Sequence, residues 1–130
     1  MINFNKALVK LLSDVQESSP NLKNTLNEIS PIAFSVHLKG HKKLYFYINN
    51  KNSSISFSEI FPSQFNINAS MIDIIQTFSS GKLKKNLIDG DTELAIVFFN
   101  AIIKSNIDFI YLIDKYFGNI PALFTYTILN

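Results

Sequence analysis

Apolar residues near the start of the chain recur at the spacing of an amphipathic helix. Four of them share one helical face because they are separated by four, three and four positions: Phe4, Leu8, Leu11 and Val15. We predict a first helix at about 3–16 and a second at about 20–29. The second begins where Ser19 can act as its cap and Pro20 can occupy its first turn.

Beyond Pro31 the apolar period changes to the alternation of a strand. Phe34, Val36 and Leu38 alternate with polar residues, and similar short segments follow. We predict a sheet at about 32–69, built as an antiparallel meander because its strands follow one another on short connections. One face would be apolar and the other would face water.

The remainder of the chain, residues 70–130, is predicted to hold helices and a fifth strand. Ser70 and Asp73 have the spacing of a capping box, and Gly81 can end the helix that they begin. Residues 82–88 are short and mixed in character, which fits a returning strand.

The most apolar stretch lies at residues 94–103. Only Asn100 is strongly polar there, and the stretch is too short to cross a bilayer, which takes about 20 residues. We predict a helix that Asp91 caps and that is covered on most sides, followed by a second apolar helix at 107–118. Two such helices need a large apolar partner, which the sheet can supply.

These elements predict a single α+β domain over residues 1–130. Helices would cover one face of a five-stranded, mostly antiparallel sheet and enclose a hydrophobic cavity. Aromatic rings fill space less easily than aliphatic side chains, so a gap between them would be a dry, elongated slot. The predicted lining of this cavity comprises Phe34, Val36, Phe46, Ile48, Phe57, Ile67, Ile75, Phe78, Leu94, Phe98, Phe99, Ile102, Ile110 and Ile113.

Composition supports a lined cavity or an apolar contact surface. Hydrophobic residues make up 47% of the chain and charged residues 17%, which is more apolar material than a domain of this size easily hides. The net charge of +2 involves lysines without any arginine, and the missing guanidinium groups argue against nucleic acid as a partner.

Two further features bear on the compartment. The chain has no cysteine, which excludes disulfides, thiol catalysis and cysteine-ligated zinc and suits a reducing environment. The first residues have neither the apolar run nor the cleavage site of a signal peptide. We therefore expect a cytoplasmic protein without a membrane span.

Candidate catalytic and metal-binding residues are few. His37 and His41 lie four positions apart across a strand end and a turn, so they should not converge on one metal ion. Asp89, Asp91 and Glu93 lack the spacing of a calcium loop, and helix capping explains them. We predict no enzymatic activity, no cofactor and no metal.

The densest positive cluster consists of Lys82, Lys84 and Lys85, to which Lys42 and Lys43 could add. Beside an anionic membrane each lysine contributes about 1 kcal/mol. The cluster therefore predicts a transient contact with a membrane surface, and a solvated loop is the alternative interpretation.

Several short motifs follow one another in a characteristic order. They are Phe34-x-Val36-x-Leu38-Lys39-Gly40, Ser80-Gly81-x-Leu83, Gly90-Asp91 at a helix start, and Gly118-Asn119-Ile120 after a helix rich in Phe and Ile. In this order and spacing they resemble the sterol carrier protein 2 type of lipid-binding domain and, within it, the UbiJ-like accessory factors of ubiquinone biosynthesis in proteobacteria. The resemblance extends over nearly the whole chain.

The resemblance implies a function as well as a fold. Relatives of this type bind lipid in a hydrophobic tunnel without catalysis, so the predicted lining would hold a lipid or polyprenyl-quinone intermediate for soluble ubiquinone biosynthesis enzymes. The candidates for contact with its polar head are Tyr45, Tyr47, Tyr111 and Asn100.

Three questions about partners stay open. UbiJ-like proteins usually continue into a long C-terminal helix that pairs with a coiled-coil accessory partner, whereas this sequence stops at Asn130, either as a shorter relative or as one domain of a longer chain. The apolar tail at 121–130 would either close the cavity or join two subunits as a homodimer. The alternative function is an assembly module whose apolar face or C-terminal tail binds another protein without lipid cargo.

Overall fold

The computed structural model describes residues 4–49, 52–105, 107–108, 111 and 115–116 of the 130-residue chain. The helices are α1 (Phe4–Ser18), α2 (Pro20–Ile29), α3 (Met71–Ser80) and α4 (Thr92–Lys104), with a short 3-10 helix η1 (Lys85–Leu87). The strands are β1 (Ile32–Leu38), β2 (Leu44–Ile48), β3 (Ser54–Ser56), β4 (Phe65–Ala69) and β5 (Ile88–Gly90).

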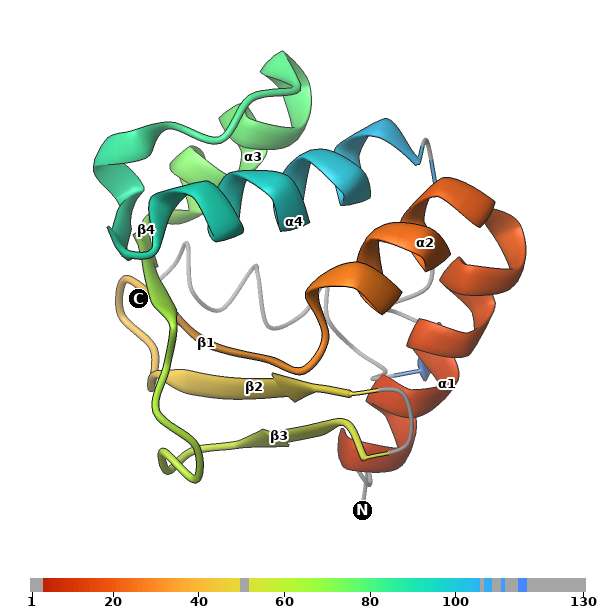
Figure 1. Cartoon of the computed structure of the whole chain (residues 1–130). Helices are drawn as coiled ribbons and strands as arrows, with labels where there is room; N and C mark the ends of the chain where they lie inside the picture. The colour runs from red at the N-terminus through yellow and green to blue at the C-terminus, as the bar shows by residue number, and fades with distance from the viewer. Residues whose placement is uncertain (1–3, 50–51, 106, 109–110, 112–114, 117–130) are drawn as a thin grey trace.

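The strands form one sheet in the order β3-β2-β1-β4-β5. The β1–β2, β2–β3 and β4–β5 pairs are antiparallel, whereas β1 and β4 run parallel. The predicted mostly antiparallel sheet is confirmed, but the predicted meander is wrong between β3 and β4. Residues 57–64 cross from the edge strand β3 to the far side of β1 (Figure 1).

Burial explains why β4 lies beside β1. Phe65 and Ile67 are 0% and 2% exposed, whereas all three residues of β3 are half-buried. Gln64 secures the crossing because its backbone N–H donates to the Ala33 carbonyl at 2.7 Å and its side-chain Oε1 accepts from the Ala33 N–H at 2.9 Å. The length of a connection does not reveal whether it is a hairpin or a crossover, so the sequence could not predict this pairing.

The helices cover one face of the sheet, as predicted. Figure 1 shows α4 running above the sheet with α2 beside it, while α1 lies at the right-hand end. The side chain of Asn5 ties α1 to the edge strand, because its Oδ1 accepts from the Ile55 N–H at 2.8 Å. Helix α3 lies behind and above α4 in the same view.

The helix ends follow the predicted local chemistry. The Ser19 hydroxyl accepts from the Leu22 N–H at 3.2 Å, and Pro20 occupies the first turn of α2. Ser70 and Asp73 form the predicted capping box at α3. Each cap satisfies backbone N–H groups that a helix start leaves unpaired.

Two further predicted caps are also present. Gly81 ends α3 in the left-handed conformation, with φ of 72°. The Asp91 carboxylate accepts from the Leu94 N–H at 3.1 Å and begins α4. Backbone geometry at both positions is therefore set by residues close in the sequence.

Other predicted boundaries moved or lie outside the described part. The fifth strand begins at Ile88, after η1, because residues 82–84 form a connection. The predicted helix at 107–118 and the tail at 121–130 fall mostly or wholly outside the described residues.

The sheet face that carries Ser35, opposite the face that carries Phe34, is less exposed than predicted. Ser35 is 0% exposed and lies in register between Tyr45 and Asn66. Its hydroxyl donates to the Asn66 side chain. This pairing lets a polar residue be buried, because its hydrogen-bonding group has a partner.

Candidate functional site

Five phenylalanine rings meet between the middle of the sheet and α4. Phe34 stacks on its cross-strand neighbours Phe46 and Phe65, with ring centroids 5.0 Å apart in both pairs. From α4, the Phe98 and Phe99 rings approach Phe34 at 5.1 and 6.4 Å. We call Phe34, Phe46, Phe65, Phe98 and Phe99 the ring cluster. Offset and edge-to-face contacts at these distances are favourable for aromatic rings.

The ring cluster fills the central space that the sequence analysis assigned to a cavity. Phe34 and Phe98 are 4% and 5% exposed, so their rings pack against one another and against their neighbours. Phe65 is missing from the predicted lining although it is fully buried here, and its alternation with Ile67 was the signal that could have included it. An apolar ligand bound at this face would therefore lie beside the ring cluster rather than between its rings.

The apolar layer continues outward from the ring cluster into half-exposed side chains. Ile48 and Ile67 from the predicted lining are buried beneath it. Five predicted residues are only half-buried and pack against the core: Val36, Phe46, Leu94, Phe99 and Ile102. We call these five half-buried side chains, which lie where the sheet meets α4, the apolar margin.

Three predicted lining residues do not face this layer. Phe57 is 60% exposed, Ile75 is 53% exposed and Phe78 is 47% exposed. Phe57 follows the last residue of β3 and belongs to the crossing connection. The prediction that these three side chains point inward is wrong. Ile110 and Ile113 lie outside the described residues.

Helix α3 turns a different stripe toward the core than predicted. Thr77 is buried, and Ile74 packs partly buried against the core. Ile75 is adjacent to Ile74 in sequence but lies about 100° around the helix, so it points elsewhere. The helix is apolar on both stripes, and its own sequence therefore does not decide which one is buried.

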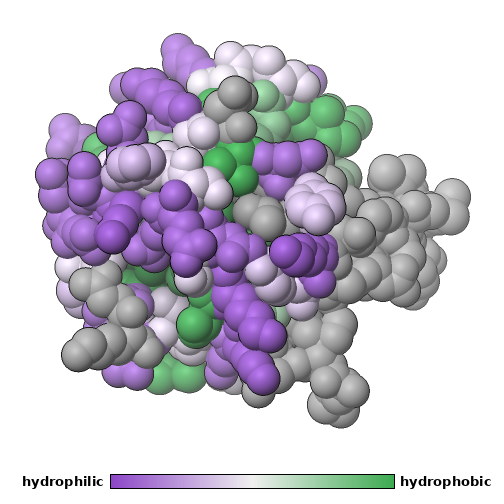
Figure 2. All heavy atoms as spheres, turned by 90° about the vertical axis from the view of Figure 1, so that its right-hand side faces the viewer, coloured by the Kyte–Doolittle hydropathy of each residue, from purple (hydrophilic) through white to green (hydrophobic). Residues whose placement is uncertain are grey.

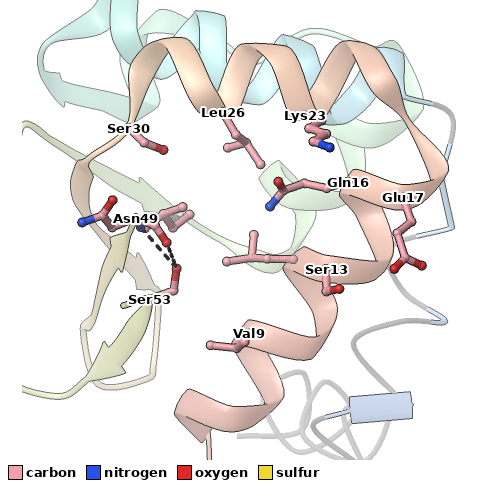
Figure 3. Close-up of a pocket in the computed structure, with 11 residues that line it drawn as sticks. Val9, Ser13, Gln16, Glu17, Lys23, Leu26, Ser30, Asn49 and Ser53 are labelled. Carbon is pink, nitrogen blue, oxygen red and sulfur yellow. Dashed lines mark hydrogen bonds between the residues drawn. The ribbon is translucent and has the colours of Figure 1, made fainter. Parts of the chain in front are cut away.

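A hollow of about 390 Å³ lies away from the ring cluster, between α1, α2 and the end of β2 (Figure 3). Its wall combines Leu26 and Ile48 with polar groups such as Gln16, Glu17 and Lys23. Of the predicted lining, only Ile48 borders it. Sequence reasoning missed this hollow because the apolar spacing within α1 and α2 does not show how the two helices pack against each other.

Polar groups also line the hollow beside the end of β2. The Ser53 hydroxyl donates to the Asn49 carbonyl at 2.9 Å and accepts from the Asn49 N–H at 3.2 Å (Figure 3). The Ser30 hydroxyl oxygen borders the same hollow and is buried without a hydrogen-bond partner among the described residues. Such a wall suits water or a polar group better than hydrocarbon.

The candidate head-group contacts are scattered. Tyr45 and Tyr47 project from the face of β2 opposite Phe46, since successive strand residues point to opposite faces. Tyr47 stacks on Phe61 at 4.1 Å, and the Lys43 ammonium lies 5.5 Å from the centre of the Tyr45 ring. Tyr111 is 60% exposed. The two β2 tyrosines are therefore on the wrong face of the sheet to contact a ligand bound beside the ring cluster.

The predicted basic cluster is at the surface. Lys82, Lys84 and Lys85 are all exposed and follow the end of α3. The Lys42 ammonium lies 5.7 Å from the centre of the Phe57 ring, so its side chain is turned toward the crossing connection.

Candidate metal ligands do not gather at one place among the described residues. In the part of the chain that the structure describes, no group of three or more His, Asp or Glu side chains could hold a metal ion. His37 is exposed and His41 half-buried. None of the helices in the described ranges has the length and hydropathy needed to cross a bilayer.

Comparisons with known proteins identify the fold. No protein-family model and no curated protein sequence matches the chain. A solved structure described as a UbiJ-SCP2 ubiquinone synthesis protein superimposes with a TM-score of 0.57, covering 80% of this chain and 92% of that chain at 16% sequence identity. At this identity the likeness shows a shared fold, and the expected resemblance to the sterol carrier protein 2 type of domain is confirmed at that level.

Proposed function

We propose that this chain is a non-catalytic, lipid-binding accessory protein of ubiquinone biosynthesis. It would hold polyprenylated intermediates in the cytoplasm and present them to soluble biosynthetic enzymes. The observation that carries the proposal is the half-buried apolar margin beside the ring cluster, on a fold shared with a ubiquinone synthesis protein.

The energetics of lipid transfer explain why a preformed surface matters. Burying hydrocarbon is worth about 0.8 kcal/mol per methylene when it leaves water. A lipid that leaves a bilayer gains almost none of this free energy, so the protein must offer apolar surface without first opening its core. The stacked rings would provide a stiff floor, and Val36, Phe99 and Ile102 would provide side chains that are already partly exposed.

This arrangement refines the expected tunnel. The cargo would lie along the margin between the sheet and α4, with its chain against the ring cluster. The hollow between α1 and α2 has polar walls, so we do not assign the hydrocarbon chain to it. The mass of the bound molecule would reveal the identity and the chain length of the cargo.

Native mass spectrometry tests the proposal directly. The protein would be produced in a bacterium that makes ubiquinone, extracted under mild conditions and sprayed intact. We expect an adduct with the mass of a polyprenylated ring compound. A wild-type protein that carries no lipid under these conditions contradicts the proposal.

A matched pair of variants on α4 locates the bound lipid. Ile102→Asp places a carboxylate in the half-buried margin, whereas Val97→Asp places the same group at a side chain that is 47% exposed. We expect Ile102→Asp to lower lipid occupancy by roughly tenfold or more relative to Val97→Asp, because a charge beside hydrocarbon must be desolvated. Circular dichroism and thermal unfolding would establish that both variants fold, and equal occupancy in the two would exclude this margin.

A specific observation also favours the alternative of an assembly module. The crossing connection exposes Phe57, Ile60 and Phe61 at 60%, 64% and 45%, and exposed apolar groups of this kind often mark protein contacts. If the protein binds a biosynthetic enzyme through this connection and never carries lipid, the assembly role replaces the carrier role.

A further inference from the structure

Helix α3 exposes an unusual amount of apolar surface for a helix of a water-soluble domain. Ile72, Ile75 and Phe78 are 66%, 53% and 47% exposed. At about 100° per residue they occupy one continuous arc of roughly 120°. A neighbouring stripe of the helix, through Ile74 and Thr77, already contacts the core. The exposed arc is therefore additional to the apolar face that folding requires.

Basic residues lie near both ends of α3. Lys82, Lys84 and Lys85 follow the helix directly and are exposed. The backbone of Lys39 lies near the other end, because its N–H donates to the Ala69 carbonyl at 2.9 Å, next to the cap Ser70. The acidic residue of α3 is Asp73, and the capping box holds its carboxylate on the Ser70 N–H.

The positions of these elements allow them to contact one flat surface. Figure 1 shows α3 and the connection that follows it together at the top of the molecule, at the opposite end from the N-terminus. A Cβ atom at Gly81 would lie 3.8 Å from the Ile103 side chain, so the end of α3 rests against the last turn of α4. In Figure 2 apolar surface gathers at the upper right, whereas the upper left edge and the face turned to the viewer are mainly hydrophilic.

We propose that the exposed arc of α3 and the lysines after it form a docking surface for anionic lipid bilayers. The apolar side chains would enter the interface between head groups and acyl chains, and the lysines would lie among the phosphate groups. Charge complementarity favours this occupant, because the exposed lysines near the ends of α3 match the phosphate groups of an anionic bilayer while the apolar side chains match its acyl chains. The surface deepens the carrier role by specifying how the protein meets a membrane, but it rests only on α3 and its neighbours.

Vesicle sedimentation with matched variants tests the apolar arc. Ile75→Asp and Gln76→Asp add the same charge to adjacent exposed positions of α3, yet only Ile75 belongs to the arc. On vesicles of phosphatidylglycerol and phosphatidylcholine in equal parts, we expect Ile75→Asp to bind roughly tenfold more weakly than Gln76→Asp. Equal binding of the two variants would show that α3 does not insert.

A second pair of variants tests the lysines. Lys82→Gln, Lys84→Gln and Lys85→Gln together change the net charge from +2 to −1, and so do Lys6→Gln, Lys10→Gln and Lys23→Gln on α1 and α2. We expect the first triple variant to lose roughly 100-fold in partitioning onto the same vesicles, and the second to lose much less. Equal losses would mean that only overall charge matters and would overturn the proposed surface.

A fluorescent reporter separates insertion from simple adsorption. The chain has no tryptophan, so Phe78→Trp provides a single indole in the arc. We expect its emission to shift to the blue on binding and to be quenched by lipids brominated on their acyl chains. Vesicle binding without these changes contradicts insertion. Normal lipid cargo together with absent vesicle binding would overturn this surface alone and leave the carrier proposal intact.

Discussion

Gly40 and Gly90 show how one residue type serves two purposes. Both have the left-handed backbone that side chains rarely adopt, with φ of 90° and 105°. Around Gly40 there is open space, whereas a Cβ atom at Gly90 would lie 2.7 Å from the Gln64 carbonyl oxygen and 3.0 Å from the Phe65 Cα. Gly90 therefore also permits the close approach of β5 to β4, which a turn alone does not require.

Alanine at these two positions separates the two effects. Gly40→Ala should lower the free energy of unfolding by about 1 kcal/mol, the usual cost of a side chain in this conformation. Gly90→Ala should cost about 1–3 kcal/mol more, because the backbone of β4 must move. Urea unfolding measures both values. Equal destabilisation would mean that β5 can separate from β4 without cost.

At the scale of the element, α3 is held by a local cap and few buried side chains. The pKa of Asp73 lies below its usual 3.8, first because the Ser70 backbone N–H donates to its carboxylate and next because of the Ser70 side chain. Lys84 and Lys39 act in the same direction. A carboxyl whose pKa is lowered by folding stabilises the folded state above the unfolded pKa, and this contribution is lost as the pH falls through the folded pKa.

This linkage predicts that the α3 cap weakens in acid. Asp73→Asn should destabilise the protein at pH 7, and the difference from the wild type should shrink below pH 3.8 as the wild-type carboxyl becomes protonated. Asp89→Asn makes the same charge change at an exposed position of β5 and serves as the control. Urea unfolding across this pH range measures the difference, and a gap that persists unchanged at low pH would refute the assigned role of the carboxylate.

At the scale of the whole molecule, the ring cluster joins the sheet to the helical layer. Phe34 contributes from the central strand, and Phe98 contacts it from α4 at a ring distance of 5.1 Å. Because α2 packs on α4 as well, the cluster supports both layers at once. This shared core also explains why an apolar cargo would be held at the margin.

Truncation of one ring tests this view. Phe98→Ala should destabilise the protein by about 3–5 kcal/mol, because it removes a buried ring and leaves a gap beside Phe34. Phe78→Ala removes the same atoms from a side chain that is 47% exposed, and its effect should stay within about 0.5 kcal/mol. Thermal or urea unfolding compares them, and similar effects would show that the ring cluster is not the centre of stability.

The site was only partly predictable, because contacts between distant segments are not contained in a local sequence pattern. Alternation in β1 and the spacing in α4 correctly predicted that Phe34 and Phe98 are buried and that Ile102 is shielded in part, whereas their contact with a ligand stays a prediction. Neither pattern could show that the rings close on one another, because ring contacts depend on the register of two strands and on the placement of α4. The inward facing of Ile75 failed because α3 has two apolar stripes and only packing chooses between them.

The sequence by itself determined what depends on a few neighbouring residues. These features are the caps at Ser19, Ser70 and Asp91, the left-handed end at Gly81, and the change of apolar period from helix to strand. Only the tertiary structure decided the parallel pairing of β1 with β4, the buried stripe of α3 and the position of the hollow. Each of those depends on contacts between segments far apart in the chain, whose free energy no local pattern contains.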